Sequence, residues 1–330
     1  MMYLYLYRNF ELVEIIAAYL SLEYTLKHRG AGTFTLTLND GEVARNFVQN
    51  DVLLIGDDAF VVENIHVFSN DGANTYEISG LHINALLSRR VVKSMTFTTA
   101  ANYENQIETL LNDTFINPTD ADRKIDGFIF NQQGIEATPT VDYTLENMEV
   151  LEVINTALGR AELGYTIDYI PEEELYSFRL IQGEDKTDDV IFSDRNNNIS
   201  NKDVYQQQQD TKNVGYLNNE GVLTSKGAAT GIERREFIIE GSEETALDEQ
   251  LAESKVLVSA EFEVVDNELY QYGRDYKLGD VVTFEDYDSN LTAQRPLLEV
   301  AFYCADTITR TTTFGDSIPT IFDKLKKKGR

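Results

Sequence analysis

Short strand-like segments separated by turn signals recur at both ends of the chain, and this pattern constrains the fold more than any other feature. Residues 34–38 alternate apolar and polar side chains and stop at Asn39-Asp40-Gly41, a hairpin signal. Residues 51–55, 59–68 and 75–79 have the same character and are also bounded by turn residues. Because the connections are short, we expect neighbouring strands to be antiparallel.

Anchor residues near the N-terminus match anchors near the C-terminus when the two ends are laid over each other. The middle interval is longer in the C-terminal copy, where we expect a longer hairpin, since loops tolerate insertions at little cost. Chance similarity among β-strands is the alternative to a true repeat. The matched anchors are Phe34 with Phe262, Asp51-Val52-Leu53 with Asp280-Val281-Val282, Val61-Val62-Glu63 with Leu297-Leu298-Glu299, and Gly80 with Gly315.

Between the repeated ends, the apolar spacing changes from that of a strand to that of a helix. Residues 81–87 predict one or two helical turns, and residues 102–115 predict a helix. Residues 144–163 give the clearest helical pattern, with Thr144 as a plausible N-cap. Strands are expected at 165–169 and 176–181. This middle part is therefore predicted to be a small α+β module.

A polar, turn-rich stretch follows this module. Residues 193–235 contain strand-like pieces, residues 222–231 resemble a mobile hairpin tip, and residues 242–251 predict a short helix. The predicted fold is mainly β, with two similar antiparallel β-barrel-like domains flanking a central α+β region. The predicted boundaries are 1–92 for the first barrel domain, 93–192 for the inserted α+β domain, 193–254 for a strand and loop extension with a short helix, and 255–330 for the second barrel domain with a basic tail.

Charge excludes some functions. The chain has 56 acidic and 28 basic residues, a formal net charge of −28. Sequence-specific nucleic-acid binding is not expected, because phosphates need Lys and Arg to neutralise them. An acidic channel wall would instead let DNA slide past, although a solvated surface accounts for most of these carboxylates.

The only cysteine, Cys304, stands in an apolar run and is expected to be a buried structural thiol, so no intrachain disulfide is possible. The N-terminus does not resemble a signal peptide. No run approaches the roughly 18 apolar residues that a membrane span needs.

Histidine is rare, and none of the three suggests a metal site. His66 lies in an apolar strand and is expected in the core or in an interface. His28 and His82 have no Cys, Asp or Glu at metal-ligand spacing.

The carboxylate groupings also point away from catalysis. Asp120, Asp122 and Asp126 faintly resemble a calcium loop but lack its spacing and its terminal Glu, so a solvated turn is expected. Glu172-Glu173-Glu174 would be the candidate acid pair for glycoside cleavage, but a surface cluster is the better interpretation. No nucleophile elbow and no phosphate loop occur. We therefore predict no catalytic residue, no cofactor-binding residue, no metal site and no cofactor.

Basic residues are the only interface candidates that stand out from so acidic a chain. Arg89 and Arg90 could bridge subunits or a neighbouring ring, or could form a salt bridge within the domain. The basic tail could dock on an acidic partner, or could simply be a frayed terminus. Its candidate residues are Lys324, Lys326, Lys327 and Lys328.

The order and spacing of several motifs resemble the siphophage tail-tip hub proteins, of the Gp37-like siphovirus type. The resemblance covers residues 1–92 and 255–325 most clearly. It is carried by Gly30 to Leu36, Asp51 to Ile55, Val61 to Ile65 and Leu86 to Val92 in the first part, and by Leu278 to Val282, Leu298 to Val300 and Thr313 to Gly315 in the last.

This resemblance implies a baseplate hub: a homotrimer with two barrel-like hub domains and inserted α+β domains. It would lie beneath the ring of distal tail protein at the end of the tail tube, and would line or close the channel through which DNA and the tape-measure protein leave. A trimer with two similar units per subunit would present six similar units to a six-fold tube. The implied partners also include the tail tube protein and receptor-binding or fibre proteins, with assembly in the host cytoplasm and no enzymatic activity.

Two rival functions stay open from the sequence. A tail-associated cell-wall hydrolase would need an acid and base pair in a cleft. A host-carbohydrate-binding adhesin would need clustered, exposed aromatic side chains, whereas Tyr and Phe here are spread over strand positions.

Overall fold

A computed structural model describes residues 2–70, 73–208, 211–241, 247–248, 250–251, 257–265, 270–305 and 308–315. The chain divides into two compact units. Unit 1 comprises residues 1–201 and 262–312, and unit 2 comprises residues 202–261 and 313–330. Among the described residues, no helix is long and apolar enough to cross a membrane.

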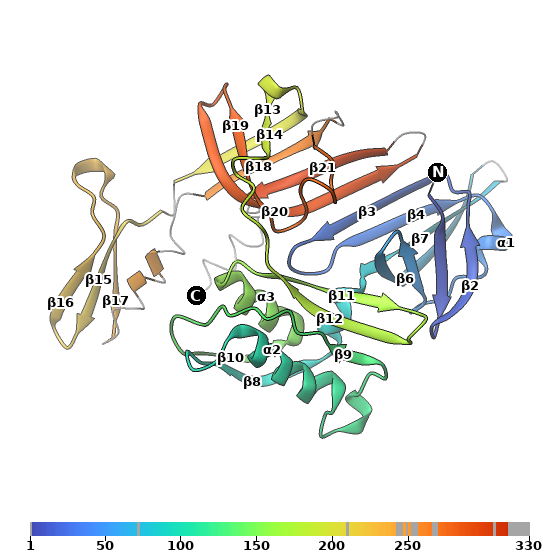
Figure 1. The fold of residues 1–330 in the computed structure, drawn as a ribbon, viewed down its shortest axis with the longest axis horizontal. Coiled ribbons are helices and arrows are strands. Elements are labelled where there is room, and N and C mark those ends of the chain that lie inside the picture. Colours follow the sequence, from blue (N-terminus) through green and yellow to red (C-terminus); the bar gives the residue numbers. More distant parts are fainter. Residues whose placement is uncertain are drawn as a thin grey trace. The chain divides into compact units, whose positions relative to one another are not determined.

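One large sheet dominates unit 1 (Figure 1). Its strands follow the order β20-β3-β4-β7-β6-β5-β1-β2, with β19 beside β20 and β13 beside β19. Portions of β14, β18 and β21 in unit 1 extend the path in the order β14-β18-β21-β20. The bounds are β1 Leu4–Arg8, β2 Glu11–Ile16, β3 Ser21–Lys27, β4 Thr33–Leu38, β5 Val52–Ile55, β6 Asp58–Asn70, β7 Ala73–His82, β13 Ile191–Ser193, β14 Ile199–Gln207, β18 Leu257–Val264, β19 Val281–Asp286, β20 Leu291–Cys304 and β21 Ile308–Gly315, with the short helices α1 Gly41–Ala44 and η4 Asp194–Asn196.

The alternation seen in the sequence fixes the faces of this sheet. In β4, Phe34, Leu36 and Leu38 are buried, while the threonines between them point to the other face. The buried side chains join those of β1, β3, β5, β6 and β7 in one core. The mainly β fold is confirmed. Because the path of the sheet is open from β14 to β2, the two closed barrels stay a proposal.

The inserted α+β module packs on the opposite face. Helices α2 and α3 lie against two small sheets, β10-β8 and β11-β12-β9 (Figure 1). Their core includes Val52, Ala59 and Val61 of the large sheet, so the module is anchored on β5 and β6. The bounds are η1 Ile83–Arg89, β8 Val91–Phe97, α2 Tyr103–Leu111, η2 Asn112–Ile116, η3 Ala121–Arg123, β9 Phe128–Phe130, β10 Tyr143–Glu149, α3 Val150–Arg160, β11 Gly164–Ile170 and β12 Leu175–Ile181.

The helix predicted at 144–163 is wrong in its first third. Residues Tyr143–Glu149 form β10, which pairs with β8, and Glu149 rather than Thr144 occupies the N-cap of α3. Pairing with a strand some fifty residues earlier in the chain overrides the local helical pattern. Asn147 has a φ of +54°, a left-handed conformation that α-helices do not accommodate.

Unit 2 contains a three-stranded sheet in the order β16-β15-β17. Its elements are β15 Val214–Asn219, β16 Val222–Lys226, η5 Gly231–Glu233 and β17 Glu236–Glu240. The segment expected as a mobile hairpin tip therefore contains an ordered strand, β16, which pairs with β15. The helix predicted at 242–251 lies largely outside the described residues. The four domain boundaries predicted from the sequence stay predictions.

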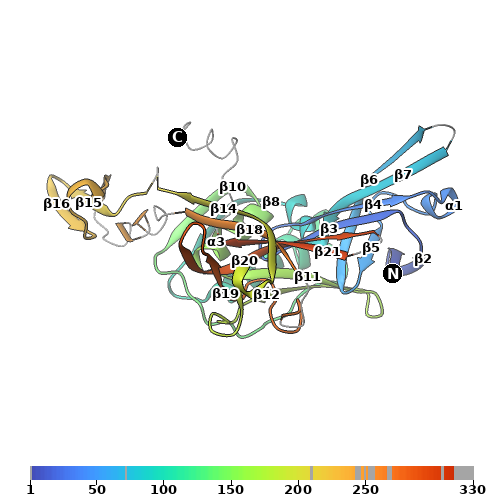
Figure 2. The same ribbon diagram turned by 90° about the horizontal axis from the view of Figure 1, so that it is seen from above.

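Hairpin β6–β7 extends beyond its neighbours. Strand β5 pairs with β6 only as far as Val61, and β4 pairs with β7 only from Tyr76 onward. The hairpin from Asn64 to Tyr76 therefore leaves the body of unit 1 as a two-stranded arm, as Figure 2 shows. We call the described part of this segment, residues 64–70 and 73–76, the arm.

Candidate assembly and channel surface

The two ends of the chain build the same strand order. Strands β4-β7-β6-β5 in the first half correspond to β18-β21-β20-β19 in the second. In both sets, the strand after the anchor aspartate pairs antiparallel with the next strand in the chain. Phe34 and Phe262, matched from the sequence, are both buried.

The turn that precedes β5 is repeated before β19 with the same backbone hydrogen bonds. Asp51 accepts a hydrogen bond from the backbone N–H of Val48 at 2.9 Å, and Asp280 accepts one from Lys277 at the same distance. The residue before each aspartate has a left-handed φ, +70° at Asn50 and +92° at Gly279. Both carboxylates are buried, so these bonds replace lost solvation.

The same bonds correct the sequence alignment. The N–H groups of Val62 and Leu297 donate to the carbonyls of Asp51 and Asp280. Val62 is thus the equivalent of Leu297, and the predicted match of Val61 with Leu297 is wrong by one residue. Strand β6 has a register shift between Val62 and Asn64, which a sequence comparison cannot show.

A seam between β20 and β3 joins the two repeats in one sheet. Six residue pairs connect the strands, from Glu299 opposite Lys27 to Cys304 opposite Leu22. On the core side, Tyr24 and Phe302 stack with ring centroids 4.6 Å apart. Burial of Cys304 agrees with its expected structural role, and burial raises the pKa of its thiol.

The opposite face of the seam is mostly polar, although it also carries Ala301, Tyr303 and Leu81, which oppose Thr25, Glu23 and Thr33. Side chains facing away from the core alternate with the buried ones along β3, β4, β7 and β20 and oppose one another across the strand pairs. Only one of them is a cation, Lys27, and it pairs with Glu299 at 3.0 Å. We call this surface the polar sheet face; it comprises Glu23, Thr25, Lys27, Thr33, Thr35, Thr37, Glu77, Ser79 and Glu299.

A shallow groove of about 740 Å³ opens on this face where it meets η1. Arg89, a predicted interface residue, lines it and forms a salt bridge with Glu63 at 3.0 Å. Arg90 instead turns inward, donating to the Arg123 carbonyl at 3.0 Å and lying 5.8 Å from the ring of Phe115. Both arginines have partners within unit 1, and their role between subunits stays a prediction. The tail residues Lys324, Lys326, Lys327 and Lys328 lie outside the described residues.

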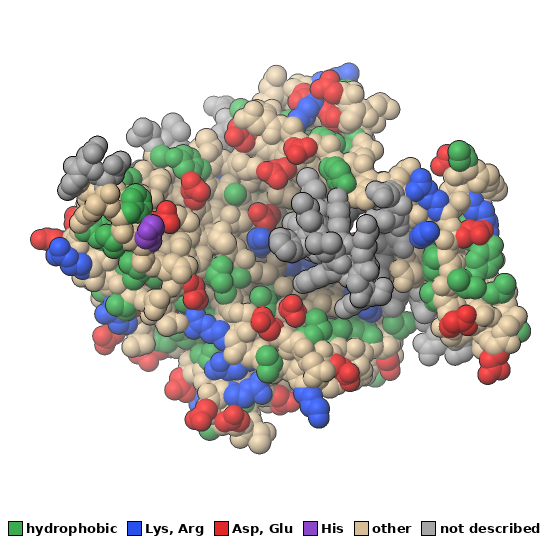
Figure 3. Space-filling view, turned by 180° about the vertical axis from the view of Figure 1, so that it is seen from behind, with side chains coloured by type: hydrophobic (Ala, Val, Ile, Leu, Met, Phe, Trp, Pro, Cys, Tyr) green, Lys and Arg blue, Asp and Glu red, His purple; other side chains and the backbone are tan. Residues whose placement is uncertain are grey.

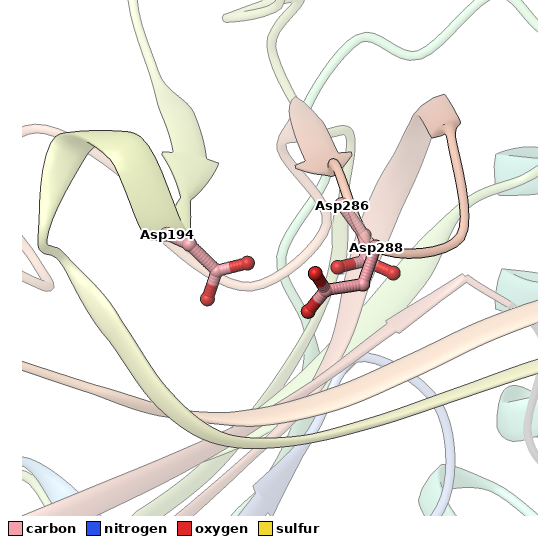
Figure 4. Close-up of side chains that lie close together, drawn as sticks. All are labelled: Asp194, Asp286 and Asp288. Carbon is pink, nitrogen blue, oxygen red and sulfur yellow. The ribbon is translucent and has the colours of Figure 1, made fainter.

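Three aspartates gather where β19 meets η4 (Figure 4). Asp194, Asp286 and Asp288 each offer an oxygen within 4.8 Å of the others, so together they could hold a metal ion. Asp286 is buried and already accepts a hydrogen bond from the Ser289 N–H at 3.0 Å. The sequence did not single out this cluster, because Asp194 lies far along the chain from the other two.

Two of the histidines lie in the interior. Burial lowers the pKa of both His28 and His82 to about 4, so both rings are neutral at pH 7. His66 is exposed on the arm, so it does not lie in the core, and the alternative that it lies in an interface stays a prediction. The arm carries β6 past the end of the sheet, and both of its faces meet solvent.

The carboxylates that were compared with a calcium loop and with an acid pair lie in a helix cap and in turns. Asp120 caps η3 by accepting the Asp122 N–H at 3.2 Å, and Asp126 pairs with Lys124 at 3.1 Å. Glu172 to Glu174 form the exposed turn between β11 and β12.

Comparison with solved structures identifies the fold. The 43 kDa tail protein of prophage MuSo2 from Shewanella oneidensis superposes with a TM-score of 0.64 at 13% identity, over 95% of this chain and 97% of that one. Prophage tail protein gp18 from Listeria monocytogenes EGD-e gives 0.58 at 11%, over 99% and 98%. A topological model of the p2 virion baseplate in its activated conformation gives 0.50 at 12%, over 97% and 100%.

Sequence comparison gives the family. No curated protein sequence matches the chain. Residues 2–316, nearly the whole length, match the profile described as Siphovirus ReqiPepy6 Gp37-like protein. The chain therefore belongs to the Siphovirus ReqiPepy6 Gp37-like family, and it has the fold of the phage tail proteins named above.

Proposed function

We propose that this protein is the hub of the tail tip: a trimeric ring that joins the distal tail ring to the end of the tail tube and lines or closes the DNA exit channel. The observation that carries the proposal is the duplication of one strand order within a single sheet. Three copies of such a chain offer six similar four-stranded units around an axis, which suits a junction between three-fold and six-fold rings.

The polar sheet face suits the wall of a channel for DNA. It spans the seam, so both repeats contribute to it. Threonine and serine hydroxyls keep it wet, while Glu23 and Glu77 give it the same sign of charge as phosphate. Its one lysine is neutralised by Glu299. The cations on the described part of this face, Lys27 and the Arg89 of its groove, are each paired with a carboxylate, so passing DNA would meet no unpaired cation there and could move without being held.

The proposal includes partners and excludes enzymatic activity. As a hub, the chain would contact distal tail, tail tube and tape-measure proteins and receptor-binding or fibre proteins, after assembly in the host cytoplasm. The baseplate among its structural relatives supports such contacts. Activity would require an acid or nucleophile in a cleft, and the groove on the polar sheet face is lined chiefly by Thr, Ser, Asn and one ion pair.

Reversing the charge of the channel wall tests the proposal. Phage carrying Glu23→Lys together with Glu77→Lys should assemble normal tails but eject DNA more slowly, because unpaired ammonium groups would bind the passing phosphates. Ejection would be timed by dye release from purified particles at several salt concentrations, and added salt should restore the rate. The control is Glu172→Lys with Glu173→Lys, on the β11–β12 turn. Equal ejection rates in both variants would reject the channel role.

A further inference from the structure

The arm is an uncovered piece of sheet. From Ile65 onward, among the described residues, no strand pairs with β6 on the side away from β7. Unpaired backbone N–H and C=O groups along such an edge are a template for another strand. Three large apolar side chains of the arm are exposed to solvent, by 39% for Ile65, 51% for Val67 and 41% for Phe68. Large apolar side chains are normally buried. In Figure 3, hydrophobic side chains gather beside the histidine in this region of unit 1.

The arm carries little charge. Between Glu63 and Glu77 the sequence has a single charged residue, Asp71, although a quarter of the whole chain is charged. Two copies of a chain with net charge −28 repel each other over most of their surfaces. An apolar surface with so few carboxylates is where two copies can meet with the least repulsion.

A second uncovered edge lies at the end of the same sheet. Strand β2 pairs only with β1 among the described strands. Leu12 and Ile15 on β2 are 50% and 47% exposed. We call these two residues and the free side of β2 the β2 edge. It carries Glu11 and Glu14, so two β2 edges would repel, whereas an arm and a β2 edge would not.

We propose that the arm of one copy adds as a strand to the β2 edge of a second copy. This inference rests on the proposed trimeric hub and names its contact. Because the arm and the β2 edge are different surfaces of one chain, the contact is head-to-tail, and a head-to-tail contact can close a three-membered ring. Backbone hydrogen bonds would supply the register, and Ile65 and Val67, which share one face of β6, would cover Leu12 and Ile15. Contact between two arms would be two-fold and could not build such a ring.

Cysteine cross-linking tests this contact directly. The only native cysteine, Cys304, is buried, so introduced thiols give a clean signal. We expect Val67→Cys combined with Ile15→Cys to shift the chain to disulfide-linked multiples of its mass under mild oxidation. The matched control is Val67→Cys with Val222→Cys, whose second position is 68% exposed on β16; it should stay at single-chain mass.

Charge insertion gives a second readout that needs no disulfide. Val67→Glu should weaken self-association at least about tenfold, since the new carboxylate would be buried unpaired at the contact. Val222→Glu should leave it unchanged. Light scattering would report the mass, and circular dichroism would show that each variant is folded.

The outcomes separate this contact from the hub itself. A trimer that forms normally in Val67→Glu and yields no cross-link overturns the arm contact and leaves the proposed hub standing. Dimers from Val67→Cys alone would mean that arm meets arm, which also overturns it. A folded wild-type chain that stays monomeric at high micromolar concentration would count against both.

Discussion

A single buried ring, His28, lies where the large sheet, the inserted module and the second repeat meet. Its backbone N–H donates to Leu298 of β20 at 2.9 Å, and its carbonyl accepts from Tyr165 of β11 at 3.1 Å. A Cβ at Gly164 or Gly279 would come within 2.3 Å of the ring, so only glycine fits on either side. Among the residues that the structure describes, neither ring nitrogen has a hydrogen-bond partner. The position is therefore suited to a neutral imidazole and not to a charged one.

We expect His28 to make the fold less stable in acid. Its pKa is about 4 when folded and 6.5 when unfolded, so between these values the unfolded chain binds the extra proton. The free energy of unfolding is unaffected above pH 6.5 and falls as the pH drops toward 4, by about 2 kcal/mol at pH 5. Urea unfolding of wild type and His28→Gln at pH 7 and pH 5 would measure the effect.

The quantity to compare is the difference between the two proteins, because His82 and Asp58 titrate over overlapping ranges. Burial lowers the pKa of His82 to about 4 and raises that of Asp58 to about 7. The wild type should lose about 2 kcal/mol more than the variant on going to pH 5. If the variant keeps the full pH dependence, His28 does not titrate as described. Histidine NMR of the wild type would check the same point should the variant fail to fold.

At the scale of elements, glycine decides where strands may approach closely. A Cβ on Gly80 of β7 would come 1.9 Å from the Val61 carbonyl and 2.9 Å from the Phe34 ring. The large sheet therefore needs glycine there, beside the register shift in β6. Gly159, in α3, is the opposite case: it is exposed, and a Cβ there would meet nothing within 4 Å.

Alanine at these two glycines should change stability in opposite directions. Gly159→Ala should stabilise the protein by about 0.5–1 kcal/mol, because alanine costs less backbone entropy in a helix. Gly80→Ala should destabilise it by about 2 kcal/mol or more, since backbone atoms must move. Thermal unfolding of both variants would measure the shifts. A destabilised Gly159→Ala protein would refute the assignment of an unobstructed helix at that position.

The elements that could be predicted are those whose signal is local. The alternation of β4, the helix that begins near residue 102 and the strands β11 and β12 follow from nearby residues. Strand β10 could not be predicted, because its partner β8 is distant in the chain. The one-residue error in the repeat has a similar cause: the equivalence of Val62 and Leu297 follows from their hydrogen bonds to Asp51 and Asp280, which neither strand shows alone.

At the scale of the whole molecule, the repeat could be predicted, but the surfaces it creates could not. The alternation of threonine with apolar residues at positions 33, 35 and 37 predicts an outward polar face. Its extension across β3 and β20 depends on the seam, which no local pattern encodes. The exposure of the arm could not be predicted either, since residues 65–68 are mostly apolar and have the composition of an ordinary buried strand.

The net charge of −28 leads to a prediction about assembly. Salt screens repulsion between copies, so self-association should strengthen, on the order of tenfold, between low and high ionic strength. Analytical ultracentrifugation at 20 mM and at 0.5 M salt would measure it. Weaker association at high salt would mean that attraction between opposite charges, such as those of the basic tail, dominates the contact.

The seam also determines when the large sheet can be completed during synthesis. Strand β3 emerges early in synthesis, but its partner β20 comes about 270 residues later, counting from Lys27 to Glu299. At the usual speed of a ribosome this is a wait of roughly 15–50 s. During that interval the edge of β3 is unfilled, and contacts between such distant segments form slowly. The polar sheet face is completed only when β20 has been made, so an unfinished chain could not take a place in the proposed ring.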